Sequence, residues 1–128
     1  MGRRLRDERG MTAIQVAILF PAVLFWIMLI VQYGLWWHAK QVANAAAAEA
    51  VDAAQVSSGT ARDGEDAASS YLAQSGNLDN VTITVSREPT AVTVEVHGDA
   101  PQLVPGFEWA VTARSTAPVE RFIPEPER

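Results

Sequence analysis

The side chains that could carry chemistry are few and scattered along the chain. The two histidines, His38 and His97, are far apart and lack the spacing of a metal-ligand pair. Asp63, Glu65 and Asp66 form an acidic cluster, but they fall where a helix is expected to begin. Negative charge is favourable at a helix N-terminus. We therefore interpret the cluster as stabilising a helix rather than as binding a cation.

Motifs for nucleophilic or cofactor chemistry are also missing. The chain has no cysteine, which excludes a disulfide scaffold, a thiolate metal site and thiol catalysis. No serine stands in a nucleophile-elbow pattern, and no glycine-rich stretch resembles a phosphate-binding loop. The glycosylation sequon at Asn80 is short enough to arise by chance. We predict a protein that is not an enzyme and that uses no metal and no cofactor.

The dominant element is a run from residue 10 to residue 39 without Lys, Arg, Asp or Glu. It exceeds the roughly 20 apolar residues that a helix needs to cross a membrane. An aromatic cluster typical of a membrane interface closes the run: Tyr33, Trp36 and Trp37. We expect a transmembrane helix that spans residues 13–35. The run is also longer than the apolar region of a cleaved secretory signal, which is about 7 to 15 residues.

Basic residues on the two sides of the span predict its orientation. Four arginines precede the span, whereas Lys40 alone follows it closely. The side with more basic residues stays in the cytoplasm. We expect a single-pass protein of the cytoplasmic membrane with a cytoplasmic N-terminus and an extracytoplasmic C-terminal domain. The chain's net charge of −5 argues against nucleic acid as a partner of that domain.

A long helix is expected to continue beyond the membrane. Residues 41–55, QVANAAAAEAVDAAQ, contain strong helix formers and neither glycine nor proline. The predicted helix therefore covers residues 11–55, with a bend at Pro21. One face carries small side chains: Val42, Ala46, Ala50 and Ala53. This helix-packing face could contact either the chain's own domain or a neighbouring helix, and the sequence leaves both alternatives open.

A small α+β domain follows over residues 56–122. Thr60 and Asp63 have the spacing of a helix start, and Gly76 is a natural helix stop. The apolar period then changes to two, which predicts three strands of an antiparallel sheet, over residues 81–86, 92–97 and 107–113. We expect residues 123–128 to be a disordered tail. A core of this size supplies only about 3 to 5 kcal/mol, so such a domain favours assembly over independent action.

The N-terminal junction is the most specific pattern. A basic segment, residues 1–10, ends in Gly10 and is followed at once by the apolar helix, as ERGMTAIQVAILFP. This junction resembles the class III leader of type IV pilins and pseudopilins, which a prepilin peptidase cuts after glycine. Two further segments, QYGLWWHAKQVANAAAAEA and APQLVPGFEWAVTARSTAPVERF, make the chain similar to the TadE-like family of the tight-adherence (Tad, or Flp) pilus system.

The resemblance implies a minor pseudopilin that takes part in pilus assembly. Its expected cleavage lies between Gly10 and Met11, and its expected partners are the peptidase, other pseudopilins and Tad pilus assembly proteins in a hetero-oligomer. The fifth residue after the cut is usually glutamate in the family, whereas this chain has Gln15. A neutral amide cannot neutralise a neighbour's free amino terminus. We therefore treat Gln15 as an assembly position: the subunit either enters beside a subunit that supplies the carboxylate, or stays in the membrane as an assembly factor. The alternative is a single-pass membrane-anchored extracytoplasmic binding domain that keeps its N-terminal arginines.

Overall fold

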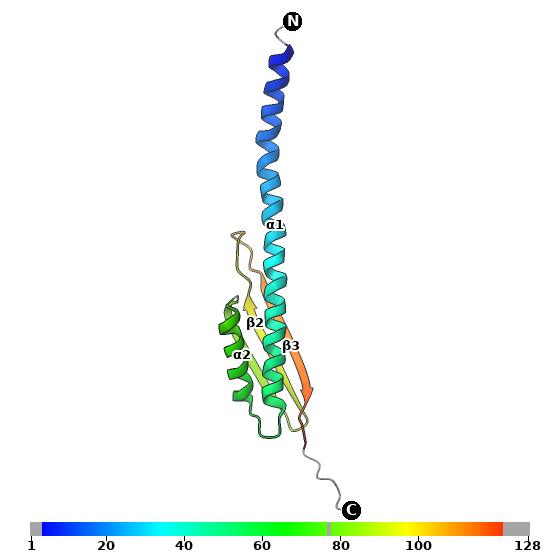
Figure 1. Cartoon of the computed structure of the whole chain (residues 1–128), viewed down its shortest axis with the longest axis vertical. Coiled ribbons are helices and arrows are strands. Elements are labelled where there is room, and N and C mark those ends of the chain that lie inside the picture. The colour runs from blue at the N-terminus through cyan, green and yellow to red at the C-terminus, as the bar shows by residue number, and fades with distance from the viewer. Residues whose placement is uncertain (1–3, 77, 122–128) are drawn as a thin grey trace, which may run out of the picture.

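The computed structural model of the chain describes residues 4–76 and 78–121, with side chains from Arg9 onward. The expected tail, residues 123–128, lies outside the described residues, as do the first three residues of the expected leader. Five elements follow in chain order: α1 (Arg4–Gln55), α2 (Ala61–Ser75), β1 (Asp79–Arg87), β2 (Ala91–Asp99) and β3 (Ala110–Pro118). This arrangement confirms the predicted α+β class, with one long helix, one short helix and an antiparallel sheet (Figure 1).

The long helix α1 has 52 residues and continues without interruption through Pro21. It begins at Arg4 and therefore runs through the expected leader, because the segment before Met11 contains helix formers and no proline. At the other end, Arg87 donates to the carbonyl oxygens of Ala54 (3.0 Å, from Nε) and Val56 (3.2 Å, from Nη2). The bond to Ala54 satisfies a carbonyl that the helix terminus leaves without a partner.

The short helix α2 has the predicted caps at both ends. The Thr60 side chain accepts from the backbone N–H of Asp63 (3.2 Å), and the Asp63 carboxylate accepts from the Thr60 backbone N–H (2.7 Å). The Thr60 hydroxyl also donates to that carboxylate (2.7 Å), and these bonds lower the pKa of Asp63 below its ordinary value. Gly76 closes the helix in the left-handed conformation, with φ of 60°.

The sheet has strand order β1-β2-β3, with both neighbouring pairs antiparallel. The prediction of the third strand was wrong at its start, because β3 begins at Ala110 rather than at Phe107. The Ala100 N–H donates to the Trp109 carbonyl (2.9 Å), and Gly106 has φ of 91°, so residues 100–109 form a closed loop. Apolar residues alternate in this loop without pairing to β2. We call residues 100–109 the tip loop.

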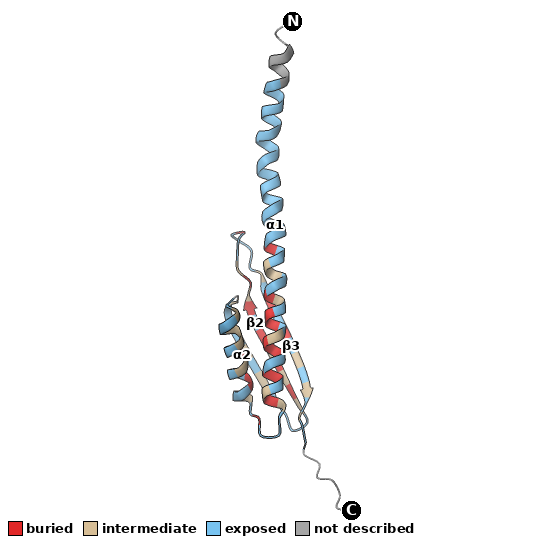
Figure 2. Ribbon diagram, in the orientation of Figure 1, coloured by how far each residue is buried: buried red, intermediate tan, exposed pale blue. Residues whose placement is uncertain are grey.

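Two helices cover one face of the sheet (Figure 1), and the core lies between them and the strands (Figure 2). The helices contribute mainly alanines and the strands mainly valines; the largest fully buried valines are Val92, Val94, Val96 and Val111. Small side chains let the backbones approach closely. A Cβ added at Gly64 of α2 would lie 2.9 Å from the Ala50 carbonyl oxygen of α1. Only glycine fits this contact without a shift.

Candidate functional site

The N-terminal half of α1 projects from the domain, and nearly all its residues from Arg9 onward are coloured as exposed (Figure 2). Over residues 11–31 every side chain is exposed except that of Leu29, which is half-buried, and none is charged. The segment is about 30 Å long at 1.5 Å per residue, which matches a bilayer's hydrocarbon core. Among the described residues, α1 is the one helix long and apolar enough to cross a membrane. The chain therefore has a single-pass membrane anchor.

The residues of the expected processing and assembly positions lie on this projecting half. Gly10 and Met11 are exposed, and a Cβ added at Gly10 would meet no atom within 4 Å. Gln15 is exposed beside a shallow hollow that it lines together with Ile18, Leu19 and Ala22. Within the described part of the chain its amide has no hydrogen-bond partner. The surface around these positions is thus open and almost entirely apolar.

The helix-packing face lies in the other half of α1 and is covered by the chain itself. Val42, Ala46 and Ala50 are buried, and Ala53 is half-buried. Ala46 and Ala50 belong to the core that α1 forms with the sheet and α2. Of the two alternatives that the sequence left open, the structure has this face against the chain's own domain. A neighbouring helix would have to use a different surface.

A line of polar side chains connects α1 to the domain, and we call it the polar seam. Three side chains spaced four residues apart each donate to a backbone carbonyl: Gln32 Nε2 to Pro101 (3.0 Å), Trp36 Nε1 to Ala110 (3.2 Å) and Lys40 Nζ to Thr112. Residues spaced by four lie on one face of a helix. Trp36 was predicted to lie at the membrane interface; in the structure Trp36 and Lys40 hold the start of β3.

Gln32 makes the most extensive contact of the polar seam. It is 0% exposed, and its Oε1 accepts from the backbone N–H groups of Leu103 (2.7 Å) and Val104 (3.4 Å). Both the donor and the acceptor end of the amide are therefore used, as a buried polar group requires. Sequence reasoning missed this residue because its partners are about 70 positions away along the chain. The one available signal was a polar amide at the end of an otherwise apolar run.

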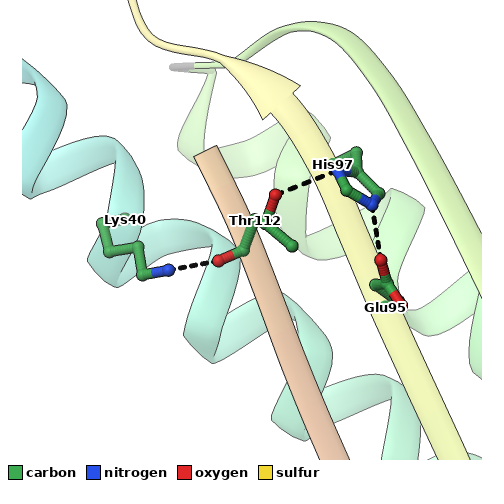
Figure 3. Close-up of polar contacts among 4 residues, drawn as sticks. All are labelled: Lys40, Glu95, His97 and Thr112. Carbon is green, nitrogen blue, oxygen red and sulfur yellow. Dashed lines mark hydrogen bonds and ion pairs between the residues drawn. The ribbon is translucent and has the colours of Figure 1, made fainter. Parts of the chain in front are cut away.

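A second polar group lies on the sheet face opposite the helices (Figure 3). The Thr112 hydroxyl contacts His97 Nδ1 (3.0 Å), and His97 Nε2 contacts the Glu95 carboxylate (2.5 Å). The order hydroxyl, imidazole, carboxylate is that of a nucleophile with its base. However, the His97 and Glu95 side chains are 50% and 38% exposed, and water screens charges at such a surface. The group's evident role is to link β3 to β2.

Comparison with known proteins gives one match. The family model described as TadE-like protein matches residues 10–52. This segment covers the expected processing site, the exposed half of α1, the polar seam and most of the helix-packing face. No curated protein and no solved structure matches the chain. The family match supports a membrane-associated component of the tight-adherence pilus, and residues 10–52 of the chain are similar to the TadE-like family.

Proposed function

We propose that the chain is a minor pseudopilin, cut by a prepilin peptidase between Gly10 and Met11 and assembled through the exposed half of α1. The observation that carries this proposal is the distribution of burial along one helix. The domain covers one face of the half of α1 that follows Gln32, while the half that follows Gly10 presents an almost entirely uncovered and mostly apolar surface. Such a surface is suited to lipid before assembly and to neighbouring apolar helices afterwards.

Gln15 gives this surface a polar position. An unpaired amide in a hydrocarbon environment is costly, and a hydrogen bond from a neighbouring helix removes that cost. Cleavage would free the amino group of Met11, which lies four residues away, or about 6 Å along the helix axis. We propose that the Gln15 side chain accepts a hydrogen bond from such a group on a neighbouring subunit. Because it is uncharged, a third subunit would have to supply the carboxylate that neutralises the amino group.

Intact mass of the membrane-extracted protein tests processing, with and without the prepilin peptidase. We expect a chain that begins at Met11 only when the peptidase is present. Gly10→Leu should abolish cleavage, whereas the control Gly34→Leu should leave it unchanged. Both glycines lie on α1 with open space around them, so neither change strains the fold. Intact N-terminal arginines on protein from assembling cells would instead support the anchored binding domain.

A matched pair of tryptophan substitutions tests assembly through the exposed half. Ala22 lines the hollow beside Gln15, whereas Ala17 lies on the opposite face of the helix at 100° per residue. Both alanines are exposed. We expect Ala22→Trp to reduce crosslinking to pilus subunits in native membranes several-fold, and Ala17→Trp to reduce it less. Equal crosslinking by both variants and the unchanged protein would contradict assembly through this face.

Gln15 itself is tested by the charge that the family usually has there. Gln15→Glu should leave cleavage intact but change which subunits co-purify, because the new carboxylate can pair with a neighbour's amino group. Gln15→Leu removes the hydrogen bond and keeps a similar volume, so it should weaken co-purification. If both variants co-purify with the same subunits in the same amounts as the unchanged chain, Gln15 is not an assembly position.

A further inference from the structure

The tip loop is held at a fixed height along α1. Its two ends are joined by the bond from the Ala100 N–H to the Trp109 carbonyl (2.9 Å). Gln32 binds the loop through both ends of its side-chain amide. In Figure 1 the loop between β2 and β3 accordingly extends past the strands along α1, toward its projecting half. The position of Gln32 on the helix therefore determines where the loop lies relative to a membrane.

Taking the uncovered segment of residues 11–31 as the membrane span, in place of the residues 13–35 expected from the sequence, puts that position at the edge of the hydrocarbon core. The uncovered, uncharged segment of residues 11–31 measures about 30 Å, which is the thickness of the core. Gln32 is the next residue, and it is buried by the tip loop rather than exposed. The aromatic side chains of Tyr33 and Trp37, which favour the headgroup level, follow directly and are exposed. The tip loop thus lies at the level of the lipid headgroups.

The loop presents apolar side chains at this level. Leu103 is 46% exposed and Phe107 is 60% exposed, while Val104 between them is buried and anchors the loop. Among the described residues after His38, the other large exposed apolar side chains are Val56 and Val81, at 39% and 37%. Among the described residues of the domain, the two most exposed large apolar side chains therefore lie on the tip loop. In water alone this exposure would be unfavourable.

We propose that the tip loop is a membrane-contacting element, with Leu103 and Phe107 inserted at the boundary between headgroups and acyl chains on the domain side of the bilayer. Glu108, which is exposed beside Phe107, disfavours attraction to anionic lipids, so the contact is apolar rather than electrostatic. Together with α1, the loop gives the domain a second point of attachment. The proposal requires the membrane anchor but neither cleavage nor pilus assembly, so it can fail separately from the proposed function.

Because the chain has no cysteine, a single cysteine introduced at a chosen position can be labelled specifically. Single cysteines at Leu103, Phe107 and Val56 would carry a nitroxide label on the full chain in bilayer nanodiscs made of zwitterionic lipid. Val56 is the control because it is an exposed apolar residue that lies about 36 Å beyond Gln32 along the axis of α1, away from the membrane segment. All three side chains are exposed, so labelling them should not disturb the core.

We expect the ratio of oxygen to nickel-chelate accessibility to be several-fold higher at positions 103 and 107 than at position 56. Equal ratios at the three positions would overturn the proposal, since the loop would then be in water. Protection at 103 and 107 that arises only when other pilus subunits are added would also overturn it, because the occupant would be a protein. A fall in the ratio when Gln32→Leu releases the loop would support it further.

Discussion

Replacing Gln32 with leucine removes the contact that holds the tip loop on α1. The variant has a side chain of similar size but can neither donate to the Pro101 carbonyl nor accept from the Leu103 N–H. A net contribution of about 1 kcal/mol per hydrogen bond, with about 1 to 3 kcal/mol for a buried backbone group left unpaired, makes the closed loop less stable by about 2 to 4 kcal/mol. The loss is local, because the alanine and valine core is untouched.

Amide hydrogen exchange, followed by mass spectrometry of the protein in detergent micelles, measures this change. A loss of 2 to 4 kcal/mol corresponds to exchange that is roughly 30-fold to nearly 1,000-fold faster at the Leu103 amide. The Val94 amide, at the centre of β2, should exchange at an unchanged rate. Gln41→Leu is the matched control, since Gln41 is an exposed glutamine of the same helix. Unchanged exchange at Leu103 in the Gln32→Leu variant would refute the argument that this amide holds the loop.

Three further predictions concern the domain, each read out by thermal unfolding in detergent. Gly64→Ala should destabilise the fold by about 1 to 3 kcal/mol, because the new Cβ would lie 2.9 Å from the Ala50 carbonyl oxygen. The cost of this overlap exceeds the gain in helix propensity, which is about 1 kcal/mol. An unchanged or higher melting temperature would contradict the close packing of α2 on α1. Thr60→Ala should lower the melting temperature at neutral pH and raise the pKa of Asp63 toward its ordinary value. A lowered carboxyl pKa stabilises the fold above the ordinary pKa, and this stabilisation is lost as pH falls through the lowered pKa, so the difference in melting temperature between variant and unchanged chain should narrow below about pH 4. A difference in melting temperature that is independent of pH would contradict the capping bonds. Arg87→Met should cost about 1 kcal/mol, because it removes the donor to the Ala54 carbonyl in the last turn of α1. Arg87→Lys should recover part of this loss. Equal stability of all three chains would show that water replaces the bond.

Local patterns allowed much of the fold to be predicted. The caps of α2 are short-range features, so Thr60, Asp63 and Gly76 identified both of its ends. The alternation of valine with polar residues identified β1 and β2 for the same reason. The start of β3 was wrong because alternation records only the local spacing of apolar residues. At Phe107, which is exposed, that spacing belongs to the unpaired tip loop rather than to a paired strand.

The candidate site was less predictable, because its contacts join distant parts of the chain. Gln32 and Pro101 are separated by 69 positions, and no sequence pattern places a loop at a given height on a helix. The helix-packing face posed a different difficulty. Alanines such as Ala46 and Ala50 permit close approach by any neighbour, so their pattern is the same whether a sheet or another helix covers them. Only the fold distinguishes the two, and it has the chain's own sheet and α2 there.

The polar seam also determines how the subunit would respond to force. Its three donors and the buried face of α1 lie along one line, roughly parallel to β3 (Figure 1). Pulling α1 along its axis therefore strains these contacts together, in shear, rather than one after another as in peeling. Because α1 continues without interruption from the membrane segment into the core, a pull on its exposed end acts on these contacts. The domain and the anchor would therefore move together when the helix is drawn out of the bilayer.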